Sequence, residues 1–178
     1  MGMNETPTGE RVHIGFFGRR NAGKSSVLNA VIGQELAVVS DVKGTTTDPV
    51  YKSMELLPLG PVTVIDTPGI DDEGELGTLA CKKSYQVLNK TDVAVIVWTA
   101  RQVLANRRRN FLIECRKSRL PCVLVFNKMD QKNAVCPEKI KDIPVLGVSA
   151  RTKAGITELK RNYCKSCKTE AVSKTTGI

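Results

Sequence analysis

The sequence predicts a three-layer α/β domain in which helices cover both faces of a mostly parallel, six-stranded sheet with one antiparallel edge strand. Three observations support this prediction. Apolar runs of strand length alternate with amphipathic stretches of helical length through the second half of the chain. A tight turn at 58–61 joins two strand-like runs, which indicates a hairpin. A glycine-rich turn separates the first strand from the first helix.

Six short apolar or alternating runs predict the strands. The runs at 93–98 and 122–126 are almost entirely apolar, as expected of parallel strands that are buried on both faces. The two runs that flank the tight turn form the antiparallel pair. In chain order, the predicted strands span 12–17, 50–57, 62–65, 93–98, 122–126 and 145–148.

Four stretches place apolar residues on one helical face and predict the helices. The first ends at Gly33, since glycine accepts the left-handed conformation of a helix C-cap. A polar, threonine-rich loop at 34–48 and an acidic loop at 71–77 separate elements in the first half. The predicted helices span 26–32, 76–89, 104–115 and 156–167.

Length and composition fit a single domain, because 178 residues are enough to bury one hydrophobic core. We expect this domain at 11–169, after a flexible leader at 1–10 and before a tail or linker at 170–178. No apolar run approaches the ~20 residues of a membrane helix, and the N-terminus lacks the apolar segment of a signal peptide. The sequence therefore predicts a cytoplasmic protein without a membrane partner.

The net charge of +9 suits an anionic ligand or partner. Three consecutive arginines at 107–109 fit a solvated helix face better than a nucleic-acid patch. Aromatic residues are few, so no stacking surface for single-stranded RNA is evident.

The glycine-rich turn at 18–25 reads GRRNAGKS and matches the phosphate-binding form G-x-x-x-x-G-K-[ST]. A strand before it and a helix after it make a chance match improbable. The backbone amides of such a turn face an anion at the start of the helix. We expect Lys24 to bridge the terminal phosphates and the Ser25 hydroxyl to ligate Mg²⁺. The nucleotide-binding residues expected here are Arg20, Asn21, Ala22, Gly23, Lys24, Ser25 and Ser26.

A second motif, DTPG, stands at the end of the strand at 62–65. The Asp66 carboxylate is expected to hold a water of Mg²⁺, and the Gly69 amide to meet the γ-phosphate. A loop with these contacts responds to the presence of that phosphate. Alone, the D-x-x-G pattern is a common turn.

Two further motifs follow later strands and are expected to bind a guanine base. In NKMD, which begins at Asn127, the Asp130 carboxylate accepts both N–H groups on the Watson–Crick edge of guanine, a pair that adenine lacks. The Lys128 stem is expected along the base face. Ser149 and Ala150 follow the next strand, and the Ala150 amide is expected to donate to guanine O6. Together the four motifs predict a GTP-binding domain.

With these motifs, the chain resembles the P-loop GTPases of the TrmE–Era group, which have a Ras-like fold. The GTTTD stretch at 44–48 resembles their GTTRD signature. The resemblance implies that Thr46 binds Mg²⁺ and that Thr45 lies beside it, whereas Thr47 replaces the usual arginine. It also implies hydrolysis of GTP to GDP and phosphate, with Lys24, Thr46, Gly69 and Asn21 as the catalytic residues.

Asn21 resembles the asparagine that binds K⁺ in the potassium-activated members of this group. The resemblance implies that Ser40 and Val42 offer backbone carbonyls to the same ion. A cation there would act like an arginine finger on the charge between the β- and γ-phosphates. Ile70 occupies the position of the water-orienting glutamine of Ras-like proteins, which implies slow intrinsic turnover. A regulatory module with negligible turnover remains a third interpretation.

Several long stretches resemble the HydF family of [FeFe]-hydrogenase maturation GTPases. In that family a dimerisation domain and a [4Fe–4S] cluster domain follow the GTPase domain, and the protein works with two radical SAM maturases and the hydrogenase. The resemblance implies a scaffold or carrier role and places the cluster outside this sequence. The alternative is an RNA-associated GTPase in tRNA modification or ribosome assembly. The matching stretches are 4–7, 17–26, 40–52, 71–77 and 85–92.

Cys164 and Cys167 form a C-x-x-C pattern, which admits a metal site. They also lie at helical spacing with apolar neighbours, and a closed metal site needs about four ligands. A packed helix face is therefore the preferred interpretation. In a reducing cytosol, the six cysteines are expected to be thiols. His13, in the first predicted strand, is expected to have no catalytic part.

Overall fold

The computed structural model describes residues 11–18, 22–33, 48–56, 59–68, 82–99, 106–140, 143–162 and 165–166. The predicted leader and tail, and nearly all of the two loops at 34–48 and 71–77, lie outside the described residues. Among the described residues, every helix is too short or too polar to cross a bilayer.

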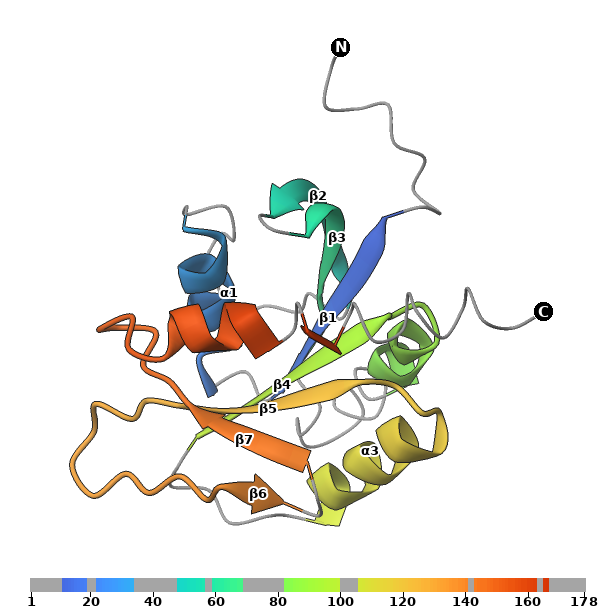
Figure 1. Ribbon diagram of the computed structural model, residues 1–178. Coiled ribbons are helices and arrows are strands. Elements are labelled where there is room, and N and C mark those ends of the chain that lie inside the picture. Colours follow the sequence, from blue (N-terminus) through green and yellow to red (C-terminus); the bar gives the residue numbers. More distant parts are fainter. Residues whose placement is uncertain are drawn as a thin grey trace.

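The described strands form one sheet in the order β2-β3-β1-β4-β5-β7-β6 (Figure 1). The five inner strands run parallel, and β2 and β6 pair antiparallel at the two edges. The strands span Val12–Gly18 (β1), Val50–Leu56 (β2), Gly60–Asp66 (β3), Val93–Thr99 (β4), Cys122–Asn127 (β5), Lys139–Ile140 (β6) and Ile143–Gly147 (β7).

Helices lie on both faces of this sheet (Figure 1). On one face, α1 (Lys24–Ile32) packs with the helical residues 156–162. On the other, α3 (Asn106–Lys117) packs with the helical residues 82–88. Alternate residues of β4 enter the two cores, which explains why its sequence is apolar throughout. The predicted three-layer α/β fold is confirmed.

The structure differs from the prediction at several boundaries. β3 begins at Gly60, inside the predicted turn at 58–61, and α3 ends at Lys117 rather than at 115. β6 is a seventh strand and a second antiparallel edge, and its two residues are too few to show an alternating pattern. β7 begins at Ile143, two residues early, although Pro144 disfavours a strand. α1 begins at Lys24 rather than Ser26, because its first turn belongs to the glycine-rich motif.

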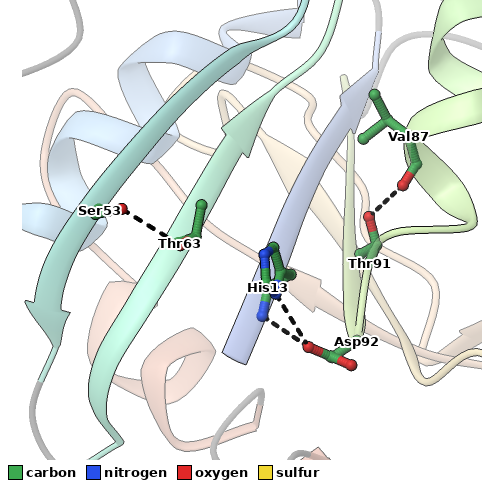
Figure 2. Close-up of polar contacts among 6 residues, drawn as sticks. All are labelled: His13, Ser53, Thr63, Val87, Thr91 and Asp92. Carbon is green, nitrogen blue, oxygen red and sulfur yellow. Dashed lines mark hydrogen bonds and ion pairs between the residues drawn. The ribbon is translucent and has the colours of Figure 1, made fainter. Parts of the chain in front are cut away.

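His13 lies at the start of β1, which ends at Gly18 of the glycine-rich turn, and Figure 2 shows it beside Asp92. Its backbone amide donates to Asp92 Oδ2 at 2.8 Å, and its Nδ1 lies 3.6 Å from the same oxygen. In return, the Asp92 amide donates to the His13 carbonyl at 2.8 Å. These contacts tie β1 to the start of β4, so His13 is the strand residue that was predicted.

The three described cysteines, Cys115, Cys122 and Cys136, carry free thiols. A hydrogen bond with Cys122 and burial raise the pKa of Cys115. Burial also raises the pKa of Cys136. Both groups are therefore protonated at neutral pH. Cys164 and Cys167 lie outside the described residues, so the two interpretations of the C-x-x-C pattern stay open.

The turn after α3 offers a test of backbone strain. The amides of Arg119 and Leu120 donate to the carbonyls of Arg116 and Cys115, at 3.0 and 3.1 Å. This is the Schellman arrangement, in which glycine normally occupies the left-handed position. Here Arg119 occupies it with φ 52°.

We expect Arg119→Gly to stabilise the chain. The strain released is about 1–2 kcal/mol, whereas the added freedom of the unfolded chain costs about 0.4–1 kcal/mol. The free energy of unfolding, measured by urea denaturation, should therefore rise by about 0.5–1 kcal/mol. Arg119→Ala is the matched control, because it removes the side chain but keeps Cβ and should bring no gain. An equal gain from both variants would contradict the strain argument.

Candidate functional site

Four strands that precede the sequence motifs run parallel: β1, β3, β5 and β7. Their carboxyl ends therefore lie at the same end of the sheet. Each of the four sequence motifs follows one of these ends. The predicted site residues that the structure describes are Ala22, Gly23, Lys24, Ser25, Ser26, Asp66, Asn127, Lys128, Asp130, Ser149 and Ala150. Those outside the described residues are Arg20, Asn21, Ser40, Val42, Thr45, Thr46 and Gly69.

Neighbouring protein atoms leave no room for a side chain at either glycine of the first motif, Gly18 or Gly23. A Cβ on Gly18 would lie 2.3 Å from the Val97 carbonyl oxygen, so β1 and β4 would be forced apart. A Cβ on Gly23 would lie 2.5 Å from Asn127 Nδ2, and Gly23 has φ 77°. The glycine-rich turn is therefore packed directly against the NKMD motif, which begins at Asn127.

Asn127 joins three of the motifs. Its side chain is almost fully buried, and Nδ2 donates to the Ala22 carbonyl at 2.9 Å. Its Oδ1 accepts a hydrogen bond from the Ala150 amide at 3.0 Å. The sequence assigned that amide to guanine O6, but here it donates to Asn127. A base contact at O6 therefore requires the Ala150 amide to be shared or released.

Ser149 orients the carboxylate that was predicted to read the base. Its buried hydroxyl donates to Asp130 Oδ1 at 2.7 Å and accepts from the Thr152 amide at 3.2 Å. Because one oxygen of Asp130 is held in this way, the carboxylate has a fixed direction. Lys128 adopts φ 63°, a left-handed conformation that is uncommon for non-glycine residues.

A cluster of charged and polar side chains lies between the start of α1 and the end of β3. Lys24 is buried, and its Nζ lies 3.1 Å from Asp66 Oδ1. Ser25 Oγ lies 3.5 Å from Asp66 Oδ2. Asp66 Oδ1 is itself buried and has the Lys24 charge as its neighbour without a well-formed hydrogen bond. A carboxylate and a hydroxyl at this spacing suit Mg²⁺, which binds oxygen ligands.

Thr67 anchors the end of β3 to Phe16 of β1, two residues before the glycine-rich turn begins. Both its amide and its hydroxyl donate to the Phe16 carbonyl, at 3.2 and 2.7 Å. Asp66 is also the register partner of Phe16 in the parallel pair of β1 and β3. No role was predicted for Thr67 from the sequence. The feature that indicates its structural role is a hydroxyl-bearing side chain that directly follows a strand and is buried.

Taken together, the described residues present a buried cation, a carboxylate and a hydroxyl near the turn after β1. At the other end of this site they present the Asp130 carboxylate, which Ser149 orients. Asn127 joins the two halves, because its side chain bonds to Ala22 in the glycine-rich turn and to Ala150. This arrangement can hold a phosphorylated ligand with a divalent cation and accept hydrogen bonds from the ligand's far end.

Residues 13–128 match the protein family described as 50S ribosome-binding GTPase. Over 153 residues, the chain is 33% identical to the tRNA modification GTPase MnmE of Chromobacterium violaceum, which covers 85% of the chain and 34% of that protein. Over 171 residues, it is 29% identical to the GTPase Der of Nitratiruptor sp., covering 89% of the chain and 37% of Der. The chain thus spans about a third of the length of these relatives.

Solved structures with the same fold include Era of Aquifex aeolicus bound to GDP·AlF4⁻. That structure superposes with a TM-score of 0.72 at 23% identity, over 86% of this chain and 56% of Era. Era in complex with MgGDPNP and nucleotides 1506–1542 of 16S ribosomal RNA gives a TM-score of 0.72 at 23% identity, over 87% of this chain and 56% of that one. At this identity the likeness concerns the fold.

Proposed function

The chain belongs to the family of 50S ribosome-binding GTPases, and from this we propose that it is a GTP-binding and GTP-hydrolysing domain of the TrmE, Era and Der type. The observation that supports this most directly is the link made by Asn127. Its side chain holds the phosphate-binding turn at Ala22 and the base-binding loop at Ala150 in one rigid unit. Such a link fixes the distance between a base and its phosphates.

In this proposal GTP and water give GDP and phosphate. Lys24 exchanges its contact with Asp66 for the terminal phosphates. Ser25 and Asp66, with Thr46 from the family resemblance, are the residues that would hold Mg²⁺, and Gly69 would donate its amide to the γ-phosphate. When bound, Mg²⁺ supplies neutralisation of charge on the phosphates. Asp130 reads the guanine edge with the carboxylate that Ser149 orients.

We extend the proposal to potassium activation through Asn21, Ser40 and Val42. We expect Asn21→Ala to abolish the difference between GTP hydrolysis in K⁺ and in Na⁺, because the side chain that holds the ion is lost. Single-turnover rates in matched K⁺ and Na⁺ buffers measure this, and Asn162→Ala, on the last helix and outside the four motifs, is the matched control. Equal rates of the unaltered protein in the two salts would refute the potassium proposal before any variant is made.

For the wider role, we propose an RNA-associated GTPase as the first candidate. The matched relatives include a tRNA modification GTPase, and a matched Era structure holds ribosomal RNA. The net charge of +9 suits a polyanionic partner. A hydrogenase-maturation scaffold is the second candidate, and the stretches at 17–26 and 40–52 favour it. Its partners would be the two maturases and the hydrogenase.

Two measurements on the natural full-length protein distinguish these roles. An RNA-associated protein should bind RNA with an affinity that falls steeply as salt rises. A hydrogenase-maturation protein, purified without oxygen, should contain iron and sulfide and give the EPR signal of a reducible [4Fe–4S] cluster. Iron-free protein after anaerobic reconstitution would refute the second role, and absent or salt-insensitive RNA binding would count against the first.

A further inference from the structure

The segment at 151–165 carries a large share of the positive charge of the chain. It holds five basic residues and one acidic residue, a net charge of +4 in a chain whose total is +9. All five basic side chains are at least partly exposed. Charges of one sign repel one another, so an anion that meets them is favoured. The basic residues are Arg151, Lys153, Lys160, Arg161 and Lys165.

Arg151 and Lys153 lie in a turn that leads directly into the helical residues 156–162. The backbone of this turn is closely packed, because a Cβ on Gly155 would lie 2.4 Å from the Gly147 carbonyl oxygen. Lys153 adopts φ 63°, a conformation that glycine accepts more easily than lysine. The fold alone therefore does not account for a lysine at this position.

The helix that follows the turn presents a further cation to solvent. Ile156 and Leu159 are buried in the core that α1 shares, whereas Glu158 and Arg161 are exposed. A helix rises about 1.5 Å per residue, so Arg161 lies about 7–8 Å along the axis from the turn. The turn and the helix thus form one continuous segment with an exposed basic surface. This basic surface consists of Arg151, Lys153 and Arg161.

Acidic partners do not account for the basic surface. Within the part of the chain that the structure describes, none of Arg151, Lys153 and Arg161 lies within ion-pair distance of a carboxylate. The end of α3 differs, because Lys117 pairs with Glu114 and a helix C-terminus attracts cations. The charge of the basic surface is therefore available to a partner outside the chain.

The surroundings of the basic surface favour a phosphate backbone over a protein. Protein interfaces have aromatic and apolar side chains at their centre, but no exposed large apolar side chain of the described residues lies between 151 and 162. The same stretch contains no aromatic residue on which an unpaired base could stack. The backbone of a double helix requires cations and no stacking surface.

We propose that the basic surface binds the phosphate backbone of double-helical RNA. This inference rests on the RNA-associated role under the proposed function, and it names the part of this domain that makes the contact. Phosphates follow one another about every 3.4 Å along a strand, so the distance from the turn to Arg161 corresponds to about two of them. Each cation that meets a phosphate releases counterions, which makes the affinity depend on salt.

A triple variant with Arg151→Gln, Lys153→Gln and Arg161→Gln tests the proposal in the natural full-length protein. We expect its affinity for a short labelled RNA duplex to fall about tenfold to hundredfold in low salt. The slope of log affinity against log salt should become shallower by about two to three, because each lost phosphate contact removes about 0.9. Fluorescence anisotropy across a series of KCl concentrations measures both. GTP affinity should be unchanged, which shows that the variant is folded.

The matched control removes the same charge from the other face of the sheet, where α3 lies (Figure 1). It combines Arg116→Gln, Lys117→Gln and Arg119→Gln, and all three side chains are exposed. The control lowers the net charge equally but should leave the salt slope unchanged. An equal loss of slope in both triple variants would show that only net charge matters and would overturn the proposal.

Glu158→Gln should give an effect of the opposite sign. The Glu158 side chain is exposed three residues before Arg161, so its carboxylate repels a phosphate backbone. Removing this charge should tighten binding of the RNA duplex about twofold to fivefold, the range for one interaction between surface charges. Unchanged or weaker binding would place the RNA contact elsewhere on the molecule.

Failure of this inference differs from failure of the RNA-associated role. If the triple variant keeps the affinity and the salt slope of the unaltered protein, the basic surface is overturned and the role stands. If the unaltered protein binds no RNA, the role and the surface are both overturned. Tighter binding of poly-glutamate or of a DNA duplex, lost in the triple variant, would assign the surface to another partner and overturn the proposal.

Discussion

Asp130→Asn is expected to lower GTP affinity by about 10²–10⁴-fold, the range for one lost hydrogen bond to a charged group together with one buried polar group left unpaired. The carboxylate can accept from both N–H groups of guanine, whereas an amide presents one acceptor and one donor. Ser149 donates to Asp130 Oδ1 in the structure, which already fixes the direction of the side chain. In the variant, the side-chain NH₂ of the new asparagine therefore faces an N–H group of guanine. Both groups are donors, so that N–H group of guanine is left unpaired.

The same change should improve binding of xanthosine triphosphate relative to GTP. Xanthine carries an oxygen where guanine carries its amino group, so the amide N–H of the Asp130→Asn variant has an acceptor to meet. Equilibrium titration with both triphosphates measures this reversal. Glu114→Gln, which neutralises a carboxylate on α3, is the control and should change neither affinity. Unaltered GTP affinity in Asp130→Asn would show that Asp130 does not read the base.

Local patterns were sufficient to predict the parts of the fold that are encoded within a few residues. The strand–turn–helix around Gly23 follows from glycine spacing and apolar periodicity, and β4 follows from an unbroken apolar run. β6 was missed because two residues, Lys139 and Ile140, contain no periodicity. The start of α1 was placed late because Lys24 and Ser25 were assigned to the motif and not to the helix.

The contacts that assemble the site could not be predicted in this way, because they join residues far apart in the sequence. Asn127 and Ala22 are separated by 105 positions, and no local pattern specifies that their side chain and carbonyl meet. The Ala150 amide was assigned to the base because a motif names its position but not its partner in the folded chain. Ser84 gave no signal at all, since a serine on a helix carries no motif and only burial reveals its bond to Pro68.

The contact between Lys24 and Asp66 leads to the second large effect that we expect. In the structure the Lys24 ammonium lies 3.1 Å from the carboxylate that is predicted to hold a water of Mg²⁺. A bound triphosphate with its cation offers both residues new partners of opposite charge, so the pair can separate without leaving a bare buried charge. Lys24 thus neutralises the same carboxylate before the ligand arrives.

We expect Lys24→Met to lower the single-turnover rate of GTP hydrolysis by about 10²–10³-fold, the usual effect of removing one preorganised group that stabilises transition-state charge. Methionine keeps most of the apolar stem, so packing in the buried position is largely retained. Affinity should fall more for GTP than for GDP, because the ammonium is expected to bridge the terminal phosphates. Rapid-quench measurement of bound GTP gives the rate.

Lys117→Met, which removes an exposed partner of Glu114, is the control and should leave the rate unchanged, because surface ion pairs contribute little. If Lys24→Met hydrolyses bound GTP at the unaltered rate, Lys24 has no part in the reaction and its contact with Asp66 is purely structural.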